Sequence, residues 1–359
     1  MASSAPKLKT IAENLGLSIG TVQRALHGKG GYSPETQKLV LEEAQRIGYS
    51  ANTAASALRR APITLGVVLP APEGKNSYFF SYIWQGIDRA CRDLSIYQID
   101  LVRCCAEPGT QEQISALEEL LNREQSPIQG LITVARQDER INALLNGFLG
   151  KGIPVFIINA LFDPASVHPM LYAIRANHQI GQLGADIFSA VHSASRGSML
   201  LLGGDRKNQL QMARTSDFSQ RVSRQCPEVN ILETHYYHDL PRLKAFIIDC
   251  LRRFDDIVGL YAVSARETLT ACQAVSEAGL EKYPTLIGTD AFPELLPFFS
   301  SGVLTASVYQ YPTKHAYIAV HMLVAKIAGN GQNDMADQFS VVPVFRSTAP
   351  IFCGQVGMI

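Results

Sequence analysis

The sequence predicts a small all-α domain followed by an α/β region of two doubly wound lobes, each a parallel sheet with helices on both faces. Two observations carry this prediction. Short helical patterns with a Gly-containing turn occupy residues 8–49. From residue 62 onward, continuously apolar strands alternate with amphipathic helical segments in two successive series. Such strands are typical of parallel sheets buried on both faces, whose ligand sites lie beyond the carboxyl ends of the strands.

The first helix is predicted at about residues 8–15. Its apolar residues recur at i, i+3, i+4 and i+7 and are Leu8, Ile11, Ala12 and Leu15. Gly16 ends this helix because glycine tolerates a positive φ. Ser18 then stands where a helix N-cap belongs, since its hydroxyl can accept from the free N–H groups of the next turn. A second helix is therefore predicted from about residue 19 to residue 27.

This second helix has two different faces. The residues expected to pack inward are Val22, Ala25 and Leu26. The residues expected to point outward are Ile19, Gly20, Gln23 and Arg24. Two short helices joined by a Gly-containing turn are typical of the helix-turn-helix that binds DNA, and an ordinary helical hairpin is the alternative.

A third helix and a short connecting segment complete the N-terminal part. Ser33 caps the third helix, which starts at Pro34, where a missing N–H costs least. Its predicted inner face consists of Leu39, Val40, Ala44 and Ile47. Residues 51–61 are rich in alanine, and a helix this short is marginal in water. This segment is either a plain linker or a helix that forms when something docks against it.

The α/β region begins after Pro62. Its first series of strands is predicted at residues 63–69, 97–103, 130–134 and 154–159, with helices at 78–93, 111–122 and 138–149. Its second series is predicted at residues 198–202, 229–235, 257–262 and 285–288, each followed by a helical segment. Two series predict two lobes.

Charge and cysteine content narrow the class of protein. Formal net charge is zero, but residues 1–60 carry eight basic and four acidic side chains, which suits a domain that meets phosphate. The seven cysteines show no disulfide or zinc-site spacing, and residues 1–10 lack the apolar core of a secretion signal. No apolar run approaches the length of a membrane span. We therefore expect a cytoplasmic protein with no membrane partner.

No transferable catalytic motif follows the predicted strands, so we expect neither an enzyme nor a cofactor. The run Gly203, Gly204 and Asp205 after a strand fits a phosphate loop, but a tight βα turn is the more ordinary alternative. His235 and His238 lie on or beside a predicted strand with no third ligand in the pattern, which disfavours a metal site.

The N-terminal motifs resemble the LacI/GalR family of transcriptional repressors, and the resemblance covers nearly the whole chain. The family pattern V-S-x-x-T-V-S-R-x-L is matched by residues 17–26. The later S-x-E-T pattern, with its A-x-x-x-G-Y ending, is matched at residues 33–36 and 44–49. The resemblance implies a helix-turn-helix domain over 1–50, a hinge helix over 51–61 and a core over 62–359.

By this resemblance, Ile19, Gly20 and Arg24 read base edges in the major groove. Arg24 can donate bidentately to guanine O6 and N7. Thr21 and Gln23 correspond to phosphate contacts, and Gln23 replaces the usual serine. The DNA-binding residues that we predict are Ser18, Ile19, Gly20, Thr21, Gln23, Arg24, Asn52 and Leu58.

The hinge resemblance rests on Asn52 and on Leu58, the leucine that wedges into a minor-groove step. Ala51 replaces the family's proline and Ser56 its usual arginine.

The remainder resembles the family's periplasmic-binding-protein-like core, two lobes with a ligand cleft between them. The resemblance places lobe 1 at about 62–173 and 304–332, and lobe 2 at about 174–303 and 333–359. The ligand-binding residues that it implies are Tyr78, Phe79, Phe80, Arg175, Arg214, Arg266, Asp290 and Gln310. Two carboxylates that commonly bind sugar hydroxyls in the family are replaced, at Ala176 and Ala265, and arginines lie nearby.

Together these features predict a homodimeric repressor that binds a pseudo-palindromic double-stranded DNA operator. Its small-molecule effector is predicted to be a sugar, a polyol or an anionic sugar derivative. A plain solute-binding protein and an α/β enzyme with a helical cap are the alternatives.

Overall fold

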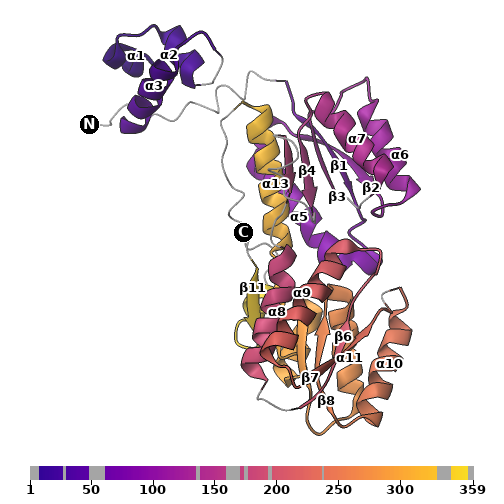
Figure 1. The fold of residues 1–359 in the computed structure, drawn as a ribbon. Coiled ribbons are helices and arrows are strands. Elements are labelled where there is room, and N and C mark those ends of the chain that lie inside the picture. The colour runs from indigo at the N-terminus through magenta and orange to yellow at the C-terminus, as the bar shows by residue number, and fades with distance from the viewer. Residues whose placement is uncertain are drawn as a thin grey trace.

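The computed structural model describes residues 8–26, 30–47, 61–134, 138–158, 170–173, 177–192, 196–236, 238–329 and 341–354. Three short helices form a unit at the N-terminal end, and two α/β lobes follow (Figure 1). No helix within these ranges is both long enough and apolar enough to cross a membrane.

The N-terminal unit consists of α1 (Leu8–Leu15), α2 (Ile19–Leu26) and α3 (Pro34–Arg46). Its core contains Ile11, Ala12, Val22, Ala25, Val40 and Ala44. Gly16 has a φ of +64°, and the Ser18 hydroxyl accepts the Thr21 N–H at 3.0 Å, which confirms the predicted end of α1 and cap of α2. The prediction for Leu39 is wrong, because 53% of it is exposed. One residue along a helix is a turn of about 100°, so the neighbour of buried Val40 leaves the inner face.

Lobe 1 holds a parallel sheet in the order β2-β1-β3-β4-β5. The strands are β1 (Thr64–Leu69), β2 (Asp100–Cys105), β3 (Gly130–Val134), β4 (Val155–Ile158) and β5 (Leu171–Ala173). Helices α5 (Ser77–Asp93) and α13 (Pro312–Ile327) cover one face. Helices α6 (Gln111–Leu121) and α7 (Glu139–Gly150) cover the other (Figure 1).

Lobe 2 holds a second sheet in the order β11-β10-β9-β8-β6-β7. Its strands are β6 (Gly197–Leu202), β7 (Val229–Thr234), β8 (Ile257–Ala262), β9 (Thr285–Thr289), β10 (Ala306–Tyr309) and β11 (Val342–Phe345). Helices α8 (Asn177–Val191) and α9 (Gln209–Gln225) pack on one face. The other face carries α10 (Leu240–Arg253), α11 (Ala265–Ala278), α12 (Leu296–Ser301) and α14 (Ala349–Gly354). The two doubly wound lobes that the sequence predicts are therefore present.

The boundary between the lobes differs from the prediction at one place. Residues 304–332 were assigned to lobe 1, but β10 pairs with β9 in the sheet of lobe 2. The chain returns to lobe 1 only after β10, where α13 packs against α5. In addition, β11 joins β10 in the antiparallel direction, so the sheet of lobe 2 is not wholly parallel. The sequence of a short apolar strand does not indicate which sheet the strand joins. Here the pairing of β10 with β9 places it in the sheet of lobe 2.

Gly86 sets how closely α5 approaches α13. A Cβ atom on Gly86 would lie 2.2 Å from the backbone oxygen of Thr313, so even a methyl group forces the helices apart. Overpacking of this kind costs about 1–3 kcal/mol or more. We expect Gly86→Ala to lower the thermal midpoint by several degrees, measured by calorimetry. In the control Gly150→Ala on α7, no atom lies within 4 Å of the new carbon, and stability should hold or rise.

Candidate functional site

A cleft lies between the two lobes, at the carboxyl ends of their strands. Lobe 1 contributes the start of α5 and the residues that follow β1 and β2, whereas lobe 2 contributes the residues after β6, β8, β9 and β10. The cleft encloses about 140 Å³. A single bound water takes up roughly 10–15 Å³ of a volume defined in this way. The cleft therefore has room for about ten water-sized groups, which is close to the number of non-hydrogen atoms in a monosaccharide.

The lobe 1 wall of the cleft is aromatic. Tyr78, Phe79 and Phe80, the aromatic residues that the resemblance implies for ligand binding, all line it from the first turn of α5. The ring of Phe79 meets that of Phe80 edge-on, with centroids 5.2 Å apart. The ring of Tyr78 stacks on Phe292 of lobe 2 at 4.6 Å and so joins the two lobes. Sequence reasoning missed Phe292, which follows β9 and reads as an ordinary core residue.

Three predicted ligand residues from distant parts of the sequence form one hydrogen-bonded chain in lobe 2. An Nη of Arg214 on α9 donates to Gln310 Oε1 at 2.7 Å, and Gln310 Nε2 donates to Asp290 Oδ1 at 2.9 Å. The other Nη of Arg214 donates to the backbone oxygen of Val263 at 3.1 Å. Arg214, Gln310 and Asp290 are 3–5% exposed. The chain therefore holds a nearly dry guanidinium in one orientation beside the cleft.

Burial governs the charges of this chain. Loss of solvent raises the pKa of Asp290 to about 6, against the opposing effects of the Arg214 charge and the Gln310 hydrogen bond. Loss of solvent also lowers the pKa of Arg214, partly offset by Asp290. Asp290 has a φ of +70°, a conformation that is costly for a residue with a side chain. Strain of this kind marks positions that the surrounding structure fixes.

Other polar side chains complete the lining. Arg266, predicted from the sequence, lines the cleft at the start of α11. Arg175, like Asn52 and Leu58, lies outside the described residues. The lining residues that the sequence analysis did not assign to ligand binding include Asn76, Glu107, Asn208, Gln211 and Ser264. Asn76 donates to Glu107 Oε1 at 2.5 Å, so the lobe 1 wall also has a polar pair. Their common signal is position just after a strand, just before a helix or, for Gln211, in the first turn of a helix.

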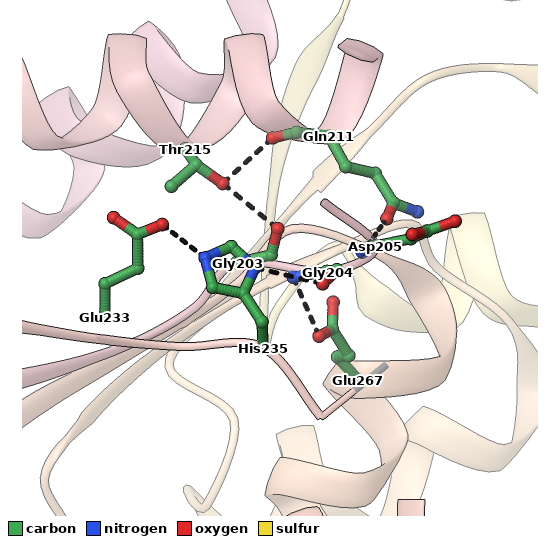
Figure 2. Close-up of polar contacts among 8 residues, drawn as sticks. All are labelled: Gly203, Gly204, Asp205, Gln211, Thr215, Glu233, His235 and Glu267. Carbon is green, nitrogen blue, oxygen red and sulfur yellow. Dashed lines mark hydrogen bonds and ion pairs between the residues drawn. The ribbon is translucent and has the colours of Figure 1, made fainter. Parts of the chain in front are cut away.

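The loop of residues 203–205 is a tight βα turn rather than a phosphate loop (Figure 2). The N–H of Gly204 donates to Glu267 Oε1 at 3.1 Å, and the N–H of Asp205 donates to Gln211 Oε1 at 2.6 Å. These backbone donors are thus engaged by side chains of the protein. His235 also faces this turn, with Nδ1 3.1 Å from the Gly204 oxygen and Nε2 2.5 Å from Glu233.

Helix α2 presents a second candidate surface. Ser18, Ile19, Gly20, Gln23 and Arg24 are exposed, and Thr21 is half-buried. The hydroxyls of Ser18 and Thr21 bond each other at 2.8 Å, and Arg24 donates to the Thr21 hydroxyl at 3.5 Å. Ile19 is 48% exposed, as large apolar side chains of α3 in the same unit also are. The outer face of α2 therefore offers one apolar and several polar groups to a partner.

Curated relatives match this chain over part of their length, and at least one of them is named as a transcriptional regulator. Catabolite control protein A of Priestia megaterium is 24% identical over 123 residues, which is 34% of this chain and 34% of that protein. HTH-type transcriptional regulator RafR of Escherichia coli is 35% identical over 95 residues, covering 26% of this chain and 28% of the relative. The matched segments thus span about a third of these relatives or less.

A solved structure and a family sequence model each match most of the chain. An ABC transporter solute-binding protein from Burkholderia graminis, in complex with D-arabinose, superimposes with a TM-score of 0.69 at 18% identity. That match covers 82% of this chain and 99% of the other, so the two share a fold. The sequence model of a family described as periplasmic binding protein domain matches residues 67–331. This chain therefore belongs to the periplasmic binding protein domain family.

Proposed function

We propose that the protein is a sequence-specific transcriptional repressor of the LacI/GalR kind, controlled by a carbohydrate-type effector that binds between its lobes. The observation that carries the proposal is the pairing of two features in one chain. One is the exposed outer face of α2 on a separate three-helix unit, and the other is the interlobe cleft. The relative that is named as an HTH-type transcriptional regulator, RafR, supports the transcriptional part of the proposal.

The DNA-binding part of the proposal uses the outer face of α2. Ile19 and Arg24 are exposed to solvent and do not pack in the core of the three-helix unit, so they can reach base edges in a major groove. Thr21 and Gln23 contact phosphate and so fix the register, the role that the family resemblance implies for them. Two subunits related by a twofold axis bring two such helices to one pseudo-palindromic operator. The protein acts in the cytoplasm, where the operator is.

The effector part uses the cleft. Phe79 and Phe80 offer apolar ring faces to the C–H face of a sugar, and Arg214, Asp290 and Gln310 offer oriented polar groups to its hydroxyls. D-arabinose in the structurally similar solute-binding protein supports a ligand of this size and polarity. The effector is a sugar, a polyol or an anionic sugar derivative, and it is bound without being converted.

Coupling between the two sites follows from the position of the cleft. A ligand that contacts both walls favours one arrangement of the lobes over another, and it shifts DNA affinity only by its difference in affinity for the two arrangements. In this protein Tyr78 and Phe292 already join the walls, so the effector acts on an existing interlobe contact.

Selection from a random pool of DNA duplexes by the intact protein tests the proposal. We expect repeated capture and sequencing to enrich a pseudo-palindromic motif. A sugar panel that includes D-arabinose, followed by calorimetry and by chromatography of the recovered sugar, tests binding without turnover. A pool that stays random after selection would refute the repressor, and a chemically altered sugar would favour an enzyme.

Gln23→Ala is expected to weaken binding to all duplexes alike. Its amide lies on the outer face of α2 and carries no charge. Its loss therefore removes a phosphate contact without changing the number of counterions that DNA binding releases. We expect a decrease of about two- to tenfold, the worth of one hydrogen bond, on selected and unselected duplexes, with an unchanged salt dependence. Fluorescence anisotropy titrations measure this. Loss confined to the selected duplex would instead make Gln23 a base-reading residue.

A further inference from the structure

The lobe 1 wall of the cleft carries one acidic side chain among its described residues. Besides the aromatic residues of α5, lobe 1 lines the cleft with Pro70, Pro108 and Val134 and with the polar side chains of Asn76 and Glu107. Glu107 lies two residues after β2 and is half-buried. Within the part of the chain that the structure describes, it is therefore the charged group that lobe 1 presents to a ligand.

Neighbouring residues hold Glu107 in place. Asn76 is the N-cap of α5, where an asparagine side chain usually accepts a backbone N–H of the first turn. Here it makes no such bond with the described first turn, and its amide donates to Glu107 Oε1 at 2.5 Å instead. The Thr110 hydroxyl and N–H both donate to the backbone oxygen of Glu107, at 2.8 and 3.3 Å. The carboxylate is thus oriented, and because a carboxylate has about four acceptor sites, the bond to Asn76 does not saturate it.

The charged side chains on the described lining balance one another. Lobe 2 supplies Arg214, Arg266 and Asp290, and lobe 1 supplies Glu107, so two cations face two anions. Asp290 carries its charge above the pKa of about 6 that burial gives it. A neutral ligand leaves this balance unchanged. An anionic ligand in an enclosed volume of about 140 Å³ would come close to Glu107 as well as to the arginines, and like charges repel strongly where water is partly excluded.

We propose that Glu107 binds the effector from lobe 1, by accepting hydrogen bonds from its hydroxyl groups, and that it restricts the effector to a neutral sugar or polyol. This inference rests on the proposed function, in which the cleft binds a carbohydrate-type effector, and it narrows the class of that effector. A hydroxyl donates to a carboxylate more strongly than to a neutral oxygen. On the opposite wall, Arg214, Gln310 and Asp290 offer their own polar groups. A ligand that bonds to both walls therefore links the lobes through directed contacts as well as through ring packing.

Calorimetry with matched neutral and anionic sugars tests the proposal on the intact protein at about pH 8, where Asp290 is ionised. The panel pairs D-glucose with D-glucuronate, D-galactose with D-galacturonate, and D-arabinose with its phosphate ester. We expect the tightest ligand to be neutral and its anionic partner to bind at least about tenfold more weakly. Glu107→Gln keeps the size of the side chain and the acceptor for Asn76, and it should lower the affinity for the neutral ligand about five- to tenfold. The affinity for the anionic partner should hold or rise, so the ratio of the two affinities narrows at least about fivefold.

Two matched variants separate charge from shape. Glu107→Asp keeps the carboxylate on a shorter side chain, so it should keep the wild-type ratio even where both affinities fall. Glu119→Gln removes an exposed carboxylate on α6 that does not line the cleft, and it should match the wild type in both affinities. An anionic sugar as the tightest ligand, or an unchanged ratio in Glu107→Gln, would overturn the proposal and leave the carbohydrate effector standing. A panel in which no sugar binds would contradict the carbohydrate effector itself, and with it Glu107 as a residue that binds it.

Discussion

Arg24→Ala should remove most of the preference for the selected duplex, lowering its affinity by about 5- to 150-fold, while binding to unselected DNA falls far less. A bidentate arginine–guanine contact is worth about 1–3 kcal/mol of discrimination, which converts to that range. The other two reading positions cannot replace it, because Gly20 has no side chain and Ile19 offers only an apolar contact. Anisotropy titrations with selected and scrambled duplexes measure the ratio.

Two matched variants separate charge from recognition in that experiment. Arg24→Lys keeps the positive charge but not the planar pair of donors, so it should retain binding to unselected DNA and still lose preference. Lys38→Ala removes an exposed cation from α3, whose partner is Glu42 at 4.0 Å, and should leave the preference intact. Full preference in Arg24→Ala would show that DNA shape or another segment reads the sequence.

Arg214→Ala should abolish the effector response, with sugar affinity falling by at least about a hundredfold. The guanidinium donates to Gln310 and its charge stabilises the ionised form of the buried Asp290, so its loss leaves that carboxyl uncompensated in a dry site. The buried oxygens of Gln310 and Val263 that accept from Arg214 would lose their donor, which costs about 1–3 kcal/mol each, so the thermal midpoint should fall as well. Calorimetry measures both quantities on the same protein.

The stability loss in Arg214→Ala needs its own control. Arg221→Ala on the same helix removes an arginine whose partner, Asp186, is on the protein surface, and should alter neither sugar affinity nor the effector response. The pair Arg214→Met with Asp290→Asn removes both buried charges and should recover much of the thermal midpoint without recovering sugar binding. Sugar binding that survives in this double variant would show that Arg214 only supports the fold.

Local signals in the sequence predicted the helices and most strands well. Gly16 and Ser18 act through their own backbone and the next turn, so their roles can be read without knowledge of the rest of the chain. The apolar strands can likewise be recognised locally, because each is a continuous run of apolar residues. The sheet that β10 joins could not be predicted, because that choice depends on β9 and α13 across a lobe boundary.

The cleft shows the same division between local and distant information. Arg214, Asp290 and Gln310 are separated by up to 96 positions, and only resemblance to a family brought them together before the structure did. Glu267 was missed for a different reason. Ser264 and Glu267 have the S-x-x-E spacing of a capping box, in which the glutamate normally accepts from the backbone N–H of the cap residue itself. Here the acceptor that it provides is used by Gly204 of a neighbouring loop, a partner that no local pattern reveals.

The most direct test of the proposed function is titration of the selected duplex with two proteins, the intact chain and a chain that lacks residues 1–60. Each is measured with and without the sugar that binds the cleft most tightly. We predict specific binding by the intact chain, a change in its affinity of at least about fivefold on addition of the sugar, and no specific binding by the shortened chain. Equal affinity of the two chains for the duplex would contradict the proposal.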